Sequence, residues 1–356
     1  MNINYYKWNK NDSKLFNKSV REILKLQQPQ IYYPIMSLFF YIHNTNNSHN
    51  IIDFKRNHYI KEILDFEYLK NYNSNILLNC KIINKSKKSQ TKLFGKVIPL
   101  LDPIHYLLNN YNLSKKRNHL LPSNYSFNSY TKINDMNNMA YIDVFFSYIV
   151  SHITETNINP SFPIYYGSVN GISDFKYDIS DDIDELKNHA GFHKMCKLID
   201  IHEIDISDSS SQSSTQSSSQ SSSQSSSQSS SQSSSNSSGY GSEYIAILKH
   251  FPIIYLFIES LEGTLEDIIQ NEMNLLLLKS CLFQITFALI YLQKHYYFTH
   301  NDLHINNIMY QSTDRPYLYY KYNNQYFKVP TYGKIFKIID FGRSIFTFRK
   351  KTYMND

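Results

Sequence analysis

The sequence predicts an α+β fold in which a small sheet precedes a helical half. Short strand-like apolar runs fill the middle of the chain, and a long amphipathic helix follows them at residues 274–295. Hydrophobic residues make up 42% of the 356 positions, enough to bury a core, while glycine (9) and proline (10) are scarce. This composition excludes a wholly disordered, collagen-like or proline-rich chain.

The first 75 residues are interpreted as an N-terminal extension. They contain helical patterns at residues 20–26 and 59–69 and asparagine-rich stretches, but no motif that indicates a function. The role of residues 1–75 therefore stays open.

Residues 76–262 are expected to form the small, β-rich part of the fold. Ile142, Phe146 and Ile149 recur at three- and four-residue spacing, so they share one face of a helix. The elements expected here are strands at 80–84 and 92–101, a helix at 140–155, and strands at 162–167 and 252–260.

A serine- and glutamine-rich tract interrupts this part at residues 207–241. Glutamine recurs at every fourth position from Gln212 to Gln232, and the repeat offers no apolar side chain to bury. Such a tract cannot offset the entropy lost on ordering, so we predict a disordered insertion. Strand-like runs on both sides indicate that it interrupts one domain and does not separate two.

Charge and cysteine content narrow the class of protein. The formal charge of +6 is mild and dispersed, which does not favour nucleic-acid binding. Cys80, Cys196 and Cys281 are far apart and odd in number, which indicates an intracellular protein without a disulfide framework. The N-terminus has no apolar core of a signal peptide, and no apolar stretch reaches about 20 residues, so no membrane span is expected.

Two short motifs follow the long helix and carry the chemistry. The first is His300-x-Asp302-Leu-x-x-x-Asn307, and the second is Asp340-Phe-Gly at the end of an apolar strand. Taken alone, His300, Asp302 and His304 are also compatible with a metal site or with an ordinary polar loop. Phosphoryl transfer needs a carboxylate to orient the attacking hydroxyl and oxygen ligands for Mg²⁺, and both motifs supply them.

Together these motifs resemble the protein kinase-like superfamily, most of all the serine/threonine-protein kinases of large (giant) DNA viruses. The resemblance covers about residues 79–348 without the Ser/Gln insertion, and it implies a bilobal fold that uses ATP and Mg²⁺. It puts His300, Asp302 and His304 in the catalytic loop, with Asp302 as the base. It makes Asn307 and Asp340 the metal ligands.

The resemblance also extends upstream of the catalytic loop. Lys96 lies on the strand that carries the nucleotide-binding lysine, and Asp143 stands where the family has a glutamate partner. Glu259 and Leu261 lie in the connector whose backbone would hydrogen-bond adenine. Asp143 is a departure from the family pattern.

Three further departures matter. No G-x-G-x-x-G precedes Lys96, where the turn at residues 83–91 offers Ser and Lys donors in its place. His304 gives the D-L-H form frequent in aminoglycoside and choline phosphotransferases, so phosphorylation of a small molecule is an alternative. Only 14 residues follow Gly342, so we expect a truncated large lobe at residues 263–356. A second chain is one possible source of the remaining helices, and an extended reading frame is the other.

The sequence therefore predicts a serine/threonine-protein kinase that acts on a protein substrate. The alternatives are a catalytically inactive pseudokinase or truncated interaction module, and the small-molecule phosphotransferase. A viral origin would put the chain in the host cytoplasm or the virion. The segment at residues 320–329, with a central Asn-Asn pair, is expected to be a structural β-hairpin.

Overall fold

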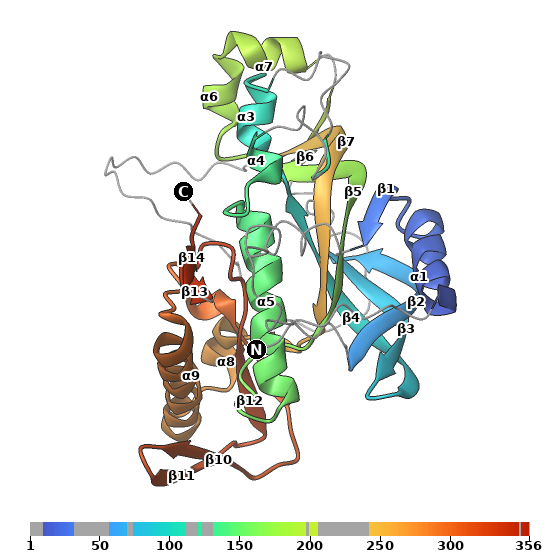
Figure 1. Ribbon diagram of the computed structural model, residues 1–356. Coiled ribbons are helices and arrows are strands. Elements are labelled where there is room, and N and C mark those ends of the chain that lie inside the picture. The colour runs from blue at the N-terminus through green and yellow to red at the C-terminus, as the bar shows by residue number, and fades with distance from the viewer. Residues whose placement is uncertain are drawn as a thin grey trace, which may run out of the picture.

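The computed structural model describes residues 10–31, 57–69, 74–111, 120–122, 131–196, 199–205, 242–348 and 350–355 (Figure 1). The predicted Ser/Gln insertion and residues 1–9 lie outside this described part. The first elements are α1 (Lys10–Glu22), β1 (Gln27–Ile31), β2 (His58–Tyr68), β3 (Ile76–Asn84), β4 (Lys87–Pro99), α3 (Pro103–Leu107), α4 (Thr131–Asn134), α5 (Met139–Glu155), β5 (Tyr165–Asp178), α6 (Ile183–Lys187), α7 (Ala190–Met195), β6 (Asp200–Asp205) and β7 (Ser242–Glu259).

These elements form what we call the sheet half. The remaining elements form the C-terminal half: β8 (Gly263–Thr264), α8 (Leu265–Asn271), α9 (Leu275–Tyr296), a 3-10 turn (Ile305–Asn307), β9 (Ile308–Ser312), β10 (Tyr317–Tyr322), β11 (Gln325–Pro330), β12 (Lys334–Ile338), β13 (Phe346–Phe348) and β14 (Lys351–Tyr353). The predicted α+β class is confirmed.

A seven-stranded antiparallel sheet organises the sheet half. Its order is β1-β5-β7-β4-β3-β2, and β6 pairs with part of the long strand β7. Side chains of β7 alternate between two cores: Leu256 and Ile258 pack with α5, whereas Tyr255 and Phe257 pack with α1. The sheet therefore lies between α1 and α5, as Figure 1 shows.

Helix α5 links the sheet to the C-terminal half. It begins after Asn138, whose side chain accepts a hydrogen bond from the Ala140 backbone N–H at 3.0 Å. Apolar side chains on several of its faces are buried, so it packs against the sheet on one side and against Phe298 and Phe341 on the other. The helix predicted at residues 140–155 is confirmed.

The N-terminal region differs from the prediction. Residues 59–69 belong almost entirely to strand β2 and not to a helix, and β1 and β2 join the sheet, so the fold does not divide at residue 76. Irregular pairing with β3 between Ile60 and Glu62 and between Ile63 and Asp65 explains the error. A bulge adds one residue, which spaces the buried Ile60 and Ile63 three apart and imitates a helical period.

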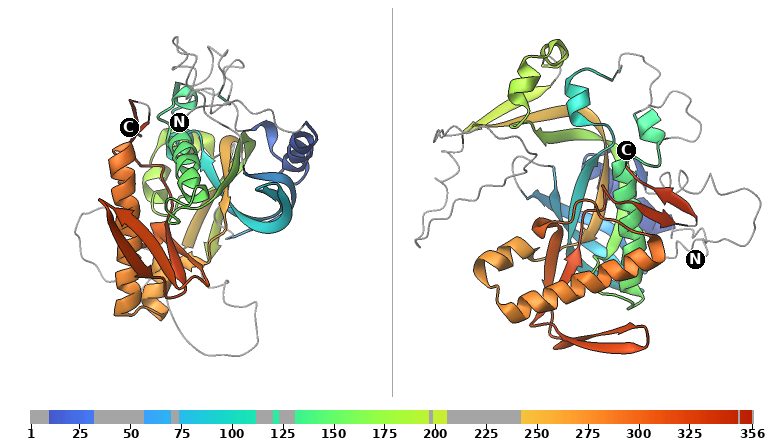
Figure 2. Two further views of the ribbon diagram at one scale, coloured as in Figure 1. Left: turned by 60° about the horizontal axis from the view of Figure 1, so that its bottom comes forward. Right: turned by 90° about the vertical axis from the view of Figure 1, so that its left-hand side faces the viewer.

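The C-terminal half contains the long helix and small antiparallel pairings (Figure 2). Strands β8, β9 and β12 form one small sheet, and β10 and β11 form the predicted hairpin. Asn323 and Asn324 close it with φ of 45° and 63°, the left-handed pair that a two-residue turn requires.

Helix α9 matches the helix predicted at 274–295. By length and composition it is the one helix of the described residues that could cross a membrane, whereas no membrane span was predicted from the sequence. In the fold it contributes seven buried side chains to the C-terminal half, so it packs as a core helix. Leu275, Leu276 and Leu282 of its outer face are more than half exposed.

Candidate active site

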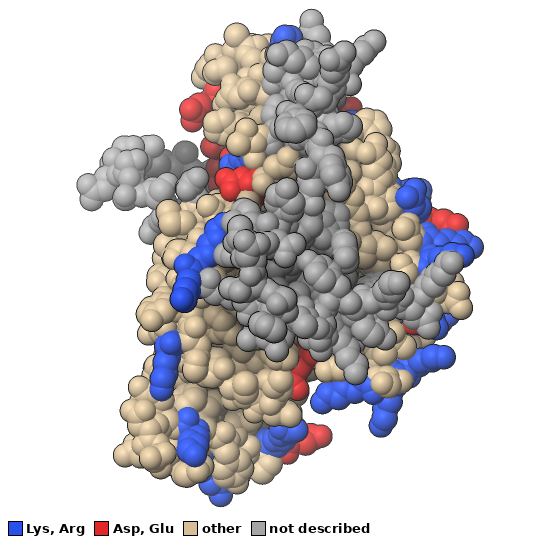
Figure 3. Space-filling model, viewed as in Figure 1, with Lys and Arg blue, Asp and Glu red and all other residues tan. Residues whose placement is uncertain are grey.

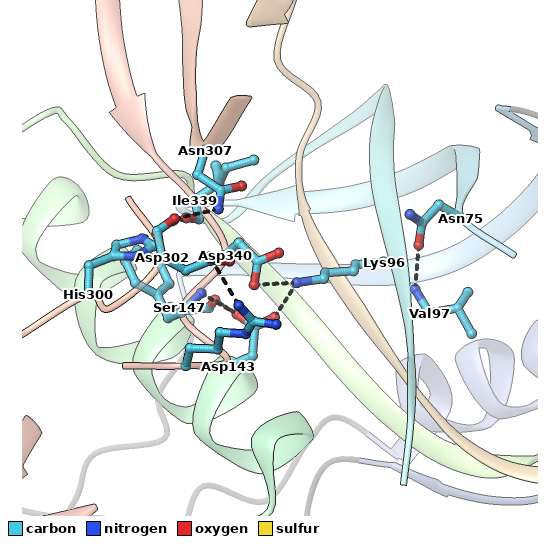
Figure 4. A network of polar contacts seen from close by, with 12 residues as sticks. Asn75, Lys96, Val97, Asp143, Ser147, His300, Asp302, Asn307, Ile339 and Asp340 are labelled. Carbon is cyan, nitrogen blue, oxygen red and sulfur yellow. Dashed lines mark hydrogen bonds and ion pairs between the residues drawn. The ribbon is translucent and has the colours of Figure 1, made fainter. Parts of the chain in front are cut away.

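The centre of the site is a lysine between two carboxylates. Lys96 faces α5 because side chains of β4 alternate, and Phe94 and Ile98 share its face. Its Nζ lies 2.6 Å from Oδ2 of Asp143 on α5 and 2.9 Å from Oδ1 of Asp340 (Figure 4). The two residues expected to pair in the sheet half thus meet, and Asp340 joins them from the loop after β12.

Asp143 is held by donors from three elements. Its side chain is 2% exposed, and its Oδ1 accepts hydrogen bonds from the Phe341 backbone N–H at 3.0 Å and the Ser147 hydroxyl at 3.4 Å. A buried carboxylate is tolerated only when donors or a cation compensate it. Asp143 therefore connects β4, α5 and the loop that carries Asp340.

Ionisation at this cluster follows from burial and charge. Burial alone lowers the pKa of Lys96, but Asp143 and Asp340 outweigh it and raise that pKa above its ordinary value. Burial works to raise the pKa of Asp340, and Lys96 overcomes it and holds the pKa below its usual value. Burial raises the pKa of the Asp143 carboxyl, an effect that Lys96 opposes.

The loop between α9 and β9 brings the second group of residues to the site. The buried His300 donates from Nε2 to the carbonyl of Ile339, directly before Asp340, at 3.0 Å. The Asn307 side chain donates from Nδ2 to the backbone carbonyl of Asp302 at 2.9 Å. The backbone carbonyl of Asn307 accepts a hydrogen bond from the Ile339 N–H at 3.1 Å. These bonds fix the two motifs against each other although more than 30 residues separate them.

Three non-glycine residues of these loops have left-handed backbones, and the first, Tyr297 with φ of 48°, is the C-cap of α9. Asn301 has φ of 63°, and its Nδ2 donates to the carbonyl of Arg343 at 3.0 Å. Asp340 has φ of 62°. Such conformations are uncommon outside glycine and gather at functional sites.

Arg343 was not singled out from the sequence, and it contacts the expected base. Its Nη1 lies 3.3 Å from Oδ1 of Asp302. By contrast, His304 is exposed, and its Nδ1 accepts from the Asn306 backbone N–H at 3.3 Å, where it caps the 3-10 turn. The signal for Arg343 was its position directly after Phe341-Gly342.

A cavity of about 190 Å³ lies beside Lys96. The sheet, α5 and the loop after β12 supply its walls, and Asn75 lies at one margin, where its Oδ1 accepts from the Val97 N–H at 2.9 Å. The lining residues are Asn75, Phe94, Lys96, Asp143, Ser147, Val150, Pro163, Leu256, Ile258, Ile339, Asp340 and Phe341.

The turn at residues 83–91 is far from this cavity. Lys85 and Ser86 close the β3–β4 hairpin, whereas Gly95, next to Lys96, pairs with Ile76 at the opposite end of β3. From the connection between β2 and β3, Asn75, the residue directly before β3, lines the cavity. The Ser and Lys donors of the turn therefore do not stand in for a phosphate-covering loop.

Glu259 and Leu261 do not line the cavity. Oε2 of Glu259 lies 2.9 Å from the buried Lys337 Nζ and accepts from the Ile164 N–H at 2.9 Å, and its own N–H donates to the Ile164 carbonyl. Glu259 thus joins β7 to β12 across the two halves. Leu261 lies in the connector to β8.

Neither family models nor curated proteins match this chain. The kinase-like resemblance in the sequence therefore stays a prediction, and the chemistry of the site rests on the contacts described above.

Proposed function

We propose that this chain is a protein kinase that transfers the γ-phosphoryl group of ATP, with Mg²⁺, to a serine or threonine hydroxyl of a protein. The observation that carries the proposal is the cluster in which Lys96 lies between Asp143 and Asp340, with Asp302 and Asn307 on the adjoining loop. A lysine paired with a helix carboxylate next to a metal-binding aspartate is the arrangement that positions ATP in kinases.

The residues around Lys96 suit a nucleotide. Its ammonium group would bind phosphate oxygens, and Asp143 keeps it directed away from the sheet at 2.6 Å. The neighbouring cavity has apolar walls that include Phe94, Leu256 and Ile258, which suit a flat base. The element order of strand with lysine, helix with carboxylate, connector and catalytic loop is also the order that the sequence resemblance implies.

Asp340 and Asn307 fit a magnesium site of the kind that phosphates complete. The described residues contain no group of three His, Cys, Asp or Glu that could hold a metal alone. Mg²⁺ at nucleotide sites needs only one or two protein oxygen ligands, because phosphates and water supply the others. The Asp340 carboxylate and the Asn307 Oδ1 would hold it, and the ion supplies positive charge against the phosphate oxygens.

Asp302 would orient the acceptor hydroxyl and take its proton. The hydroxyl oxygen then bonds to the γ-phosphorus, the bond to the β–γ bridging oxygen breaks, and ADP leaves. Arg343 holds the Asp302 carboxylate at 3.3 Å and adds positive charge on this side of the site. His300 keeps the loop in place through the Ile339 carbonyl.

The test is radioactive phosphate transfer from [γ-³²P]ATP by the full chain. Acceptors are a Ser/Thr peptide library, choline and an aminoglycoside, and Asp302→Asn is compared with Asp184→Asn on the exposed face of α6. We expect transfer to peptides that Asp302→Asn lowers at least about 10²-fold and Asp184→Asn leaves unchanged. Transfer to the small molecules alone, or equal rates for both variants, would refute the proposal.

A further inference from the structure

The β10–β11 hairpin and the first turns of α9 enclose a groove of about 480 Å³ outside the proposed nucleotide site. The helix contributes Leu276, Lys279 and Phe283, and β11 contributes the opposite wall from Tyr326 to Pro330. The inner face of the hairpin packs on α9 through a small core of its own. This packing holds the two walls of the groove together.

Both walls are cationic. The α9 segment Leu275–Tyr296 and the hairpin segment Tyr317–Pro330 together contain four lysines and no aspartate or glutamate. In Figure 3, Lys and Arg side chains follow one another down the lower left-hand edge of the molecule, over α9 and the hairpin, without Asp or Glu between them. Lys279 and Lys328 are among the residues that line the groove, and the Lys328 ammonium group lies 3.9 Å from the centre of the Tyr317 ring, on the hairpin face turned away from α9. The surface thus complements a negatively charged partner.

The groove also borders a free strand edge. In a two-residue hairpin the residues next to the turn, here Tyr322 and Gln325, form a hydrogen-bonded pair, and such pairs then alternate along the ladder. The N–H groups of Tyr326 and Lys328 consequently point away from β10. Within the described ranges β11 pairs with no strand except β10, and the Pro330 carbonyl on the same edge accepts from Ser280 of α9 at 2.6 Å.

We propose that this groove binds an extended acidic segment of a partner protein, which adds to β11 as a third strand. The backbone of the segment pairs with Tyr326 and Lys328, its acidic side chains meet Lys279 and Lys328, and its apolar side chains pack on Leu276 and Phe283. The free strand edge favours a peptide, because a nucleotide chain cannot continue the backbone ladder of a sheet. The exposed rings of Tyr326 and Tyr332 would also suit base stacking, so single-stranded nucleic acid is the competing outcome of the test. This inference concerns binding and does not depend on phosphoryl transfer.

The charge part of the proposal is tested with a fluorescein-labelled eight-residue peptide of alternating Glu and Val. Fluorescence anisotropy with the full chain should show binding at least about tenfold tighter than that of the matching Lys-Val peptide or of a twelve-nucleotide oligothymidylate. Lys279→Glu, on the exposed surface of α9, should weaken the Glu-Val peptide by about tenfold or more. Tighter binding of oligothymidylate, or no preference between the two peptides, would overturn the proposal.

The strand-addition part is tested by Tyr326→Pro against Tyr326→Ala. Both variants remove an exposed ring, but only proline also removes the outward N–H, and the ladder to β10 does not use that group. We expect the proline variant to bind the Glu-Val peptide at least about tenfold more weakly than the alanine variant, with equal melting temperatures. Equal affinities would contradict strand addition. A lower melting temperature for the proline variant would show that the Tyr326 N–H bonds to β10 and does not point away from it.

Discussion

The two sides of the proposed active site are built in different ways. On the sheet side, regular elements carry Lys96 and Asp143, and a buried contact of 2.6 Å between side chains positions them. On the loop side, hydrogen bonds to backbone carbonyls position His300 and Asn307, while Asn301 and Asp340 take left-handed conformations. The difference indicates that Lys96 and Asp143, the charged residues of the sheet side, are part of the protein core. Asp340, on the loop side, lies at the edge of that core.

This difference separates stability from activity. Removing a charge on the sheet side leaves its partner or its donors buried, so folding should suffer along with chemistry. Asp340 on the loop side is 38% exposed, so water can compensate a change there.

Asp340→Asn should lower phosphoryl transfer by about 10³-fold or more, because a neutral amide cannot replace the charge of the carboxylate on a metal. Asparagine tolerates the left-handed backbone at this position, where φ is 62°, so the melting temperature should stay close to that of the unchanged protein. Transfer assays and thermal unfolding measure the two effects. Undiminished turnover would remove Asp340 from the site.

Asp143→Ala should lower the free energy of unfolding by about 3 kcal/mol, the lower end for breaking a buried ion pair, because Lys96 keeps Asp340 as a partner. The Phe341 N–H and Ser147 hydroxyl also lose their acceptor. Urea unfolding measures the change, with the exposed Asp184→Ala as the control. If Asp143→Ala lowered activity but not the free energy of unfolding, the sheet side would not differ from the loop side in its contribution to stability.

His300 should make the loop side sensitive to mild acid. Burial lowers the pKa of His300, so protons bind this group more readily in the unfolded chain. Its stabilising contribution is therefore complete above about pH 6.5 and falls by about 1 kcal/mol per pH unit as the pH drops toward the folded-state pKa. Among the described residues the buried Nδ1 of His300 has no hydrogen-bond partner, so a proton there would find no acceptor within this part of the chain.

The matched variant for His300 is His300→Gln, which keeps an amide donor for the Ile339 carbonyl and does not titrate. The difference in unfolding free energy between the two proteins should change between pH 7.5 and 5. If the difference in unfolding free energy stayed constant over this range, His300 would have the same pKa in the folded and the unfolded protein.

The smallest effect should come from deleting residues 207–238. Asp205 of β6 pairs with Ser242 of β7, so the described residues nearest to the deletion on either side already lie side by side. Shortening the connection from 36 to about four residues should stabilise the fold by at most about 2 kcal/mol, because closure entropy changes slowly with loop length. Calorimetry should show one transition at the same or a slightly higher temperature. Loss of cooperative unfolding would show that the tract is structural.

The sequence predicted the loop side better than the sheet side, because chemistry-bearing residues of the loop side are adjacent in the chain. His300 to Asn307 and Asp340 to Gly342 form two short motifs, whereas the sheet-side residues are isolated in apolar elements. Asp143 could be selected only through the resemblance. Arg343 has no signal except its position directly after Phe341-Gly342, because its partner Asp302 lies 41 residues away in the chain. Ser147 stands one helical turn after Asp143, so it becomes a candidate only once Asp143 is selected.

Two errors of prediction have physical causes. Bulges in β2 imitate a helical period, which local patterns cannot distinguish from a helix. The turn at residues 83–91 precedes Lys96 in the sequence. Because β4 is long, the turn lies at one end of this strand and Lys96 lies near the other.

Thermal unfolding with ATP is the sharpest test of the proposed nucleotide site, because it reports nucleotide binding whether or not a protein substrate is known. The full chain, Asp340→Asn and Asp184→Asn are each heated with no ligand, with ATP and EDTA, and with Mg²⁺ and ATP. We expect Mg·ATP to raise the melting temperature of the unchanged protein and of Asp184→Asn by several degrees. The rise in Asp340→Asn should be far smaller. An equal rise in Asp340→Asn, or no rise in any of the three proteins, would contradict a magnesium–nucleotide site at Lys96 and Asp340.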